Sequence, residues 1–292
     1  MKNIRFVSIV LLSLFLYGTQ SYSNTLTEKF LGSVAKDIGK SLSNKVSEMV
    51  KAPHSSANQN YCELHLKYGE PSIADNNNIK ICRKGYALIF NTFTKTPLWV
   101  AERLTKEQVY GKGVRQLQFT QDPDIAYNKQ ASKSDYTRSG YDQGHMAPAA
   151  DFSQDQQMMD ESFYYSNIVP QDPDNNRHIW AALEKRVRNW VINRNELYIV
   201  TGPIFINMKV NSTIGYSKIA VPDALFKIVF DPDTKNAIAF MMQNKSLDEK
   251  DLTQYIVSVR DIEMATGLNF HNLLPVNVQE QFETKRSGIW KR

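Results

Sequence analysis

Features that define several protein classes are scarce in this sequence. It has only two cysteines in 292 residues, and neither has neighbours that suggest a zinc site or a nucleophile. After the first residues, no apolar run is long enough to cross a membrane. There is no internal repeat and no low-complexity tract. With 42% hydrophobic and 22% charged residues, the composition is that of a folded globular protein rather than a disordered one.

The N-terminus has the pattern of a secretory signal. Lys2 and Arg5 precede an apolar run over residues 6–16, which is too short to span a bilayer comfortably. Small residues just before Asn24 predict cleavage there, which makes residues 1–23 a signal peptide. The protein is then exported to the periplasm or the medium, with no stable membrane insertion after cleavage. An uncleaved anchor is the alternative.

Export bears on the two cysteines, Cys62 and Cys82. An isolated pair in an exported protein usually forms a disulfide. The loop between them is short, and the chain-entropy model gives a stabilisation of roughly 3 kcal/mol. Two free thiols are the alternative.

The charge balance is basic, with 35 Lys and Arg residues against 30 Asp and Glu residues, a net charge of +5 and a pI of about 9.0. Removal of Lys2 and Arg5 with the signal lowers the net charge from +5 to +3. This balance suits a polyanionic partner but does not identify one, because many basic proteins bind no nucleic acid.

The remaining chain divides into two parts. Residues 24–57 contain an expected amphipathic helix, with apolar residues every fourth position over 26–51, and a polar linker. Docking on the main domain, pairing with a second copy and lying on a membrane surface are all left open for this helix. Residues 58–292 form one domain of mixed α and β structure, in which strands come in runs. Strands are expected at 86–91, 97–101, 197–202, 220–222, 225–230 and 237–243, and helices from the polar cluster at 174–176 to about 193 and at 252–267.

The stretch 142–148, Asp-Gln-Gly-His-Met-Ala-Pro, is the first candidate for chemistry. His145 follows a glycine, and a neutral imidazole is the side chain best suited to take a proton from water near neutral pH. On its own, however, a single histidine is more often structural.

Three ordered motifs together resemble the DNA/RNA non-specific endonuclease family. They are Asp-x-Gly-His-x-Ala-Pro at 142–148, Ser-Asn-Ile-x-Pro-Gln at 166–171 and Asn-x-x-x-Trp-x-x-x-Glu at 176–184. Similarities at 200–203, 219–227 and 261–268 extend the resemblance over about residues 60–276. It implies an α+β ββα-metal (His-Me finger) fold over residues 58–292, with a central, mainly antiparallel sheet flanked by helices.

The resemblance also implies roles for individual residues. His145 is expected to be the general base, and Asn176 the direct ligand of one Mg²⁺, for which Mn²⁺ can substitute. Asn167 is expected to position the base or the phosphate, Glu184 to act as an outer carboxylate, and Arg115 to stabilise the transition state. DNA and RNA are the expected substrates, cut with little sequence preference to leave 5′-phosphate ends.

The spacing of Asn176 and Glu184 limits how they can share an ion. In an ideal α-helix they lie roughly 12 Å apart along the axis and about 80° apart around it, so one small ion cannot easily contact both. We therefore expect a metal-bound water to bridge to Glu184, an arrangement that Mg²⁺ favours because it retains several waters. Pairing of Glu184 with Arg188 at i+4 is the plainer alternative, and Trp180 is expected in the core.

Asp142, Gln143 and Arg138 are expected to contact the substrate. Gln143 departs from the family, which usually has arginine there, and a neutral amide donates a weaker hydrogen bond than a cation does. This change affects catalytic strength or substrate preference more than reaction type, and compensation by Arg138 is left open. Two alternatives follow: an enzyme of the same fold restricted to one substrate, such as DNA or single strands, and a catalytically weak nucleic-acid-binding protein. A homodimer and a protein inhibitor are also left open.

Overall fold

The computed structural model describes residues 59–71, 77–248 and 251–291. Contacts group His54–Arg292 into one compact unit, which contains all the described residues. The signal peptide and the amphipathic helix expected before residue 58 lie outside the described residues, so both stay predictions. No helix in the described ranges is long and apolar enough to cross a membrane.

A seven-stranded antiparallel sheet forms the centre of the described unit, in the order β1-β2-β3-β6-β9-β10-β11. The strands are β1 Asn78–Cys82, β2 Ala87–Asn91, β3 Thr96–Thr105, β6 Glu196–Ile204, β9 Ala224–Asp231, β10 Asn236–Gln243 and β11 Ile256–Val257. The apolar runs expected as strands fall within this sheet, apart from 220–222, which overlaps the small strand β8. The predicted α+β class with a mainly antiparallel sheet is confirmed.

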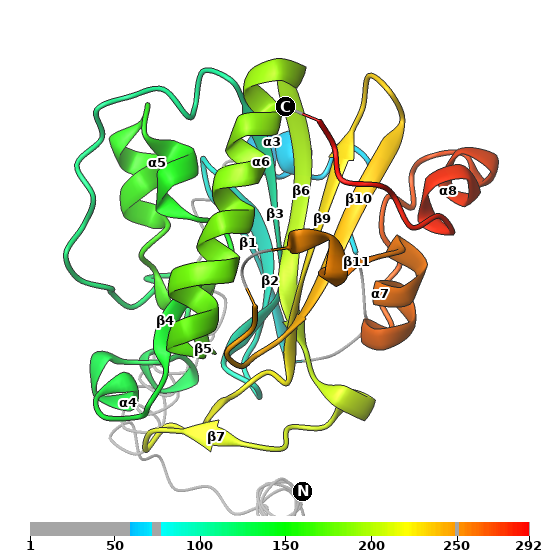
Figure 1. Cartoon of the computed structure of the whole chain (residues 1–292). Coiled ribbons are helices and arrows are strands. Elements are labelled where there is room, and N and C mark those ends of the chain that lie inside the picture. Colours follow the sequence, from blue (N-terminus) through cyan, green and yellow to red (C-terminus); the bar gives the residue numbers. More distant parts are fainter. Residues whose placement is uncertain (1–58, 72–76, 249–250, 292) are drawn as a thin grey trace, which may run out of the picture. The chain divides into compact units, whose positions relative to one another are not determined.

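The sheet separates two hydrophobic cores, because successive side chains of a strand point to opposite faces. On β3, Val100 and Leu104 enter one core, while Trp99 and Ala101 enter the other. Helix α6, Ala181–Arg194, covers the first face and crosses in front of the sheet in Figure 1. The second core is closed by α3 Gln59–His65, α7 Val259–Thr266 and α8 Val276–Glu283.

A small second sheet lies beside α6 and leads into it. Strands β4, Asp142–His145, and β5, Ile168–Gln171, pair antiparallel, with His145 opposite Ile168. The chain then enters a π-helical turn, Asn175–Trp180, that continues directly into α6. This strand–strand–helix unit is the ββα arrangement that the resemblance implied.

Short elements connect these parts. The remaining helices and turns are the 3-10 turns Tyr127–Lys129, Ala149–Phe152, Tyr165–Asn167, Ile206–Met208 and Leu252–Tyr255, with α4 Lys133–Tyr136 and α5 Gln156–Glu161. The last small sheet pairs β7 Thr213–Ile214 with β8 Ile219–Ala220.

The helix expected at 252–267 begins later than predicted. Residues 256–257 pair with β10 as strand β11 instead. Helix α7 starts only after Ser258, whose side chain and that of Asp261 form a capping box. It does end at Gly267 as expected, since that glycine has a φ of 72°.

The predicted disulfide between Cys62 and Cys82 is present, with a Cα–Cα separation of 5.2 Å. It joins α3 to the last residue of β1. The alternative of two free thiols is therefore excluded in this structure.

Candidate active site

Strand β4 presents His145 in a largely enclosed position. The ring lies between Phe119 and Phe163, with ring centroids 5.0 Å away in each case, and only 9% of the residue is exposed. Burial, with a further contribution from the nearby Arg115 cation, lowers the pKa of His145 to about 3. The imidazole is therefore neutral near pH 7, which is the protonation state of a base.

The two ring nitrogens of His145 have different surroundings. Nε2 is buried and has no hydrogen-bond partner among the described residues. The residue nevertheless lines a polar pocket. Nδ1 is therefore the nitrogen available to a molecule in the pocket.

Asn167 lies behind the histidine and does not line this pocket. It is fully buried. Its Oδ1 accepts from the backbone N–H of Ala147 at 2.9 Å, and its Nδ2 donates to the carbonyl oxygens of Ala147 and Ser162, both at 2.9 Å. These bonds hold the chain two residues after His145, so the side chain acts on the histidine through the backbone.

The start of the helix places Asn176 at the pocket. Asp172 caps the free N–H groups, with its Oδ1 accepting from Asn175 N at 3.0 Å, so the cap is Asp172 rather than the 174–176 cluster itself. The amide nitrogen of Asn176 donates to Asp142 Oδ2 at 3.0 Å. With the nitrogen engaged, the amide oxygen is the group that can bind a cation in the pocket.

The carboxylate of Asp142 is engaged by two neighbours, the amide of Asn176 and the guanidinium of Arg177. Arg177 donates to it through Nε at 2.8 Å and through an η nitrogen at 2.6 Å. Burial raises the pKa of Asp142, but the hydrogen bonds from Arg177 and Asn176 outweigh this effect and lower it. The ionised carboxylate thus orients Asn176, and the substrate contact expected of Asp142 stays a prediction.

Glu184 faces the same pocket from α6. The alternative that Glu184 forms an ion pair with Arg188 is wrong, because Arg188 forms its ion pair with Asp151 at 2.7 Å. Burial raises the pKa of Glu184 to about 7, against the opposing charges of Lys227 and Arg188. Trp180 is fully buried, as expected for a core residue.

The pocket brings together most of the predicted residues in a cavity of ≈ 400 Å³. Its lining includes Arg115, Asp142, Gln143, His145, Asn176 and Glu184. Gln143 also donates to the hydroxyl of Tyr165 at 3.2 Å. Arg138 is exposed, does not line the pocket and has a φ of 59°, so its side chain supplies no cation to this lining.

The donor atoms of the pocket suit one hard divalent cation. Amide and carboxylate oxygens from Asn176 and Glu184 are the ligand type that Mg²⁺ prefers, directly or through water. No cluster of three or more His, Cys, Asp or Glu side chains that could hold a metal occurs in the described part of the chain. The residues therefore fit an ion held by few protein ligands and several waters, rather than a closed cage.

Several residues around the pocket have no single-residue signal in the sequence. They are Phe119, Phe163, Asp151, Arg177 and Lys227. Arg177 directly follows Asn176 and could have been found by its position in that motif. The others come from separate segments that only the fold brings together, so spacing along the chain does not reveal them.

Comparison with known proteins identifies the family to which this chain is similar. The family model for DNA/RNA non-specific endonucleases matches residues 66–277. The chain is 34% identical over 230 residues to nuclease C1 from Cunninghamella echinulata var. echinulata, covering 74% of this chain and 90% of that protein. It is 33% identical over 217 residues to mitochondrial endonuclease G from Homo sapiens, covering 70% and 72%. A chain in the crystal structure of the EndoG/EndoGI complex, which addresses EndoG inhibition, is similar with a TM-score of 0.69 and 29% identity, covering 77% of this chain and 95% of that one.

Proposed function

This chain belongs to the DNA/RNA non-specific endonuclease family and is a phosphodiester-hydrolysing enzyme, and on that premise we propose how its pocket performs the reaction. Neutral His145 removes a proton from the attacking water through Nδ1, and the amide oxygen of Asn176 binds a divalent metal. The observation that supports this most directly is that both side chains line one cavity together with Arg115 and Glu184.

Mg²⁺ is the proposed metal, and Mn²⁺ has a similar preference for oxygen ligands. When bound, it would offset the charge of the scissile phosphate and of the departing 3′ oxygen. Asp142 fixes the orientation of the Asn176 amide by accepting its N–H. Glu184 accepts hydrogen bonds from water in the pocket, and its carboxylate is held near Lys227 and Arg188.

Arg115 provides the positive charge on the side of the pocket nearest the histidine. Its guanidinium lies 5.1 Å from the ring centroid of Phe163, and its charge contributes to the low pKa of His145. A fixed cation at this place stabilises the negative charge that develops on the phosphate during attack. The same charge thus serves both the base and the transition state.

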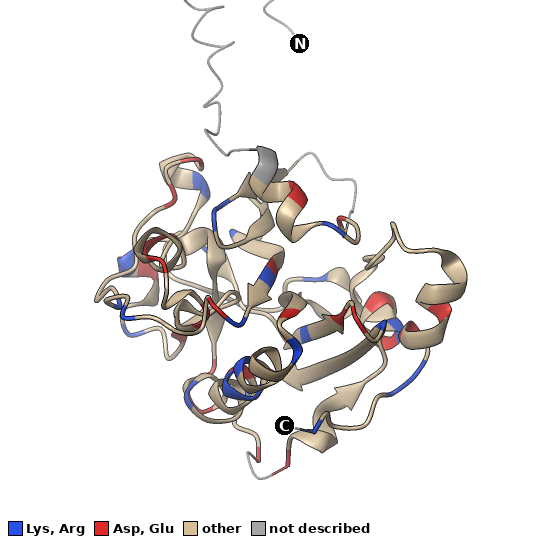
Figure 2. Ribbon diagram, turned by 90° about the horizontal axis from the view of Figure 1, so that it is seen from above, with Lys and Arg blue, Asp and Glu red and all other residues tan. Residues whose placement is uncertain are grey.

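Low sequence preference follows if the enzyme contacts phosphates and sugars, which carry no base identity. Basic residues recur along α6, which Figure 2 shows nearly end-on, and they are Lys185, Arg186, Arg188 and Arg194. Lys185 is exposed and could follow a phosphate backbone next to the pocket. Such contacts weaken as salt is added, because counterions compete for the phosphates.

The proposal has three further parts. Hydrolysis leaves 5′-phosphate and 3′-hydroxyl ends, as the resemblance implies. Export to the periplasm or the medium rests instead on the signal-like pattern of residues 1–23. A protein inhibitor is a candidate partner, since a similar solved chain is in a complex with EndoGI. The second candidate function is an enzyme restricted to one class of nucleic acid, and the neutral Gln143 in place of the usual arginine favours it.

The test is nicking of a supercoiled plasmid in Mg²⁺ by the wild type and by His145→Ala. Loss of a general base lowers the rate by about 10²–10⁴-fold, and EDTA should abolish cleavage by the wild type. His178→Ala is the matched control, because His178 is exposed and does not line the pocket. Equal cleavage by His145→Ala and the wild type would refute the proposal. Rates on double-stranded DNA, single-stranded DNA and RNA separate the two candidate functions.

A further inference from the structure

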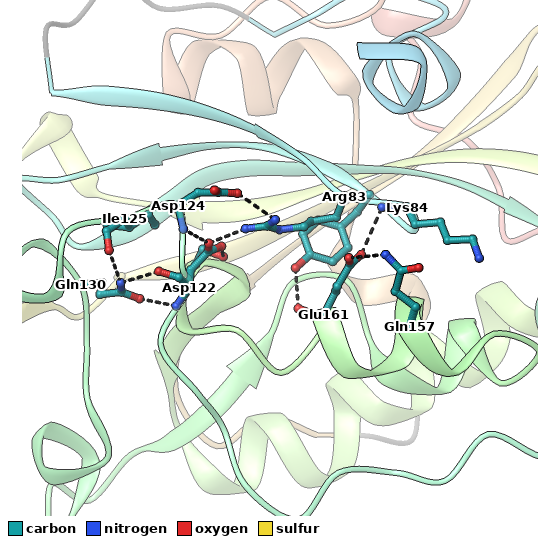
Figure 3. Close-up of polar contacts among 10 residues, drawn as sticks. Arg83, Lys84, Asp122, Asp124, Ile125, Gln130, Gln157 and Glu161 are labelled. Atoms are coloured by element: carbon teal, nitrogen blue, oxygen red, sulfur yellow. Dashed lines mark hydrogen bonds and ion pairs between the residues drawn. The ribbon is translucent and has the colours of Figure 1, made fainter. Parts of the chain in front are cut away.

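A buried ion pair lies between the β1–β2 turn and the long segment that carries Arg115. Arg83 donates through one η nitrogen to Asp122 Oδ1 and through the other to Asp124 Oδ2 at 2.8 Å. The side chain of Arg83 is 10% exposed and that of Asp122 is fully buried. Figure 3 shows the guanidinium between the two carboxylates. Charges this deeply buried are costly unless paired, so the pair constrains where this segment can lie.

The segment in question, residues 106–131, is termed here the Arg115 loop, and it is attached on both sides of Arg115. Before Arg115, Gln156 of α5 accepts from Val114 N and donates to Val114 O, both at 2.8 Å. After it, Thr120 N donates to Phe163 O at 3.1 Å, and Thr120 O accepts from Tyr165 N at 2.9 Å. Arg115 itself is exposed, so its place depends on these attachments.

Asp122 also contacts the segment behind the histidine. Its Oδ2 accepts from the hydroxyl of Ser166, which is fully buried. Ser166 directly precedes Asn167, whose side chain binds the backbone of Ala147, two residues after His145. One carboxylate therefore contacts both the Arg115 loop and the segment that holds the histidine.

We propose that Arg83 and Asp122 are positioning residues for catalysis, which fix Arg115 relative to His145 through the Arg115 loop and Ser166. This inference rests on the proposed role of Arg115. Neither residue lines the pocket, so neither touches the substrate. A displacement of Arg115 of about 1 Å lowers the rate by up to about 10²-fold.

The experiment compares Asp122→Asn, Arg115→Ala and the double variant by kcat and KM on plasmid DNA. Asp122→Asn should lower kcat more than it raises KM, and in the Arg115→Ala background it should have little further effect, because the residue it positions is gone. Trypsin should cleave after Lys112 and Arg115 faster in Asp122→Asn than in the wild type. Arg83→Lys, which keeps the charge but can reach only one carboxylate, should have an intermediate effect.

Asp231→Asn is the matched control, because it breaks a buried ion pair with Arg194 on the far part of α6. It should lower the melting temperature without changing kcat or tryptic cleavage in the Arg115 loop.

If Asp122→Asn does not fold, Ser166→Ala decides the question, since it removes only one bond to Asp122. Multiplicative losses in the double variant, or unchanged tryptic cleavage, would overturn the inference. An unchanged kcat in Arg115→Ala would instead refute the proposed role of Arg115. The rate of tryptic cleavage in Asp122→Asn would then still show whether the ion pair holds the Arg115 loop in place.

Discussion

At the scale of single residues, the sequence predicted most of the side chains that line the pocket, but not the residues that surround them. The motif around His145 indicated a base, and the pocket does contain that side chain beside Asn176 and Glu184. The enclosure that keeps the imidazole neutral comes from Phe119 and Phe163, which lie in other segments. Burial of this kind depends on which segments pack together, and a spacing rule contains no such information.

Gln143 allows a test of how much one cation contributes to the site. The side chain lines the pocket and donates only a neutral hydrogen bond to Tyr165. Gln143→Arg should raise kcat/KM by roughly fivefold at low salt, because a charge-assisted bond to phosphate contributes about 1 kcal/mol more than a neutral one. Steady-state cleavage of plasmid DNA at two salt concentrations measures the change.

The matched control adds the same charge outside the pocket. Gln157→Arg does so on α5, where the glutamine is exposed and bonded to Glu161, and it should leave kcat/KM nearly unchanged. If both arginine variants gain equally, general attraction of DNA explains the effect. A loss in Gln143→Arg would mean that the pocket has no room for a guanidinium beside Tyr165.

At the scale of elements, long apolar strands were predicted and the short polar ones were not. Runs such as 86–91 and 225–230 lie in the central sheet, where nearly every residue is buried. Strand β4 contains Asp-Gln-Gly-His, which has no strand-like composition, so only the resemblance implied it. Pairing with β5 and the surrounding contacts determine this strand, as tertiary context often overrides local preference.

The helix that carries Asn176 also departs from the geometry assumed for it. The expected offset between Asn176 and Glu184 was calculated for a regular α-helix, but Asn175–Trp180 is a π-helical turn. Such turns are rare, occur frequently at functional sites and follow from no residue propensity. The assumption of a regular α-helix between Asn176 and Glu184 was therefore wrong, although both side chains do line one pocket.

Gly144 tests how tightly β4 and β5 must approach. A Cβ at this position would lie 2.1 Å from Gln171 Oε1. Gln171 is buried and donates to Asn175 Oδ1 at 2.8 Å, so it cannot move without disturbing the helix start. Gly144→Ala should lower the free energy of unfolding by about 1–3 kcal/mol and reduce plasmid cleavage. Urea unfolding and a nicking assay measure the two effects.

Gly288→Ala is the control for this substitution, since a Cβ there meets no atom within 4 Å. Both variants make the same chemical change, but only one of them crowds a neighbouring side chain. Wild-type stability in Gly144→Ala would mean that Gln171 finds another position at no cost, and the close approach would then not explain the glycine.

At the scale of the whole molecule, buried charge under α6 connects the sheet to the pocket. Lys227 of β9 is buried and donates to Thr201 Oγ1 at 2.6 Å. Glu102 of β3 is also buried, and burial raises its pKa well above the usual value. These residues come from separate strands, so no local pattern in the sequence joins them to Glu184. Long-range arrangements of charge are the part of the site least accessible from sequence.

Buried histidines give the molecule a definite dependence of stability on pH. Burial lowers the pKa of His271 to about 4, where it lies between Phe230 and Phe282. Burial has the same effect on His65 and, together with Arg115, on His145. In the unfolded chain a histidine binds a proton below about pH 6.5. Each group therefore stabilises the fold fully above that pH, and the stabilisation is lost as the pH falls toward the folded pKa.

His271→Asn isolates one of these groups. Asparagine suits the backbone, because residue 271 has a φ of 53°, and it does not titrate. Between pH 6.5 and 4 the variant should lose less stability than the wild type, by about 3 kcal/mol, since the folded pKa of about 4 lies roughly 2.5 units below the unfolded value. Glu184 and Glu283, whose pKa values burial raises to about 7, act in both proteins and cancel in the difference. Urea unfolding from pH 4 to 8 measures this, with the exposed His178→Asn as control. Parallel curves for His271→Asn and the wild type would show that His271 does not remain neutral in the folded protein.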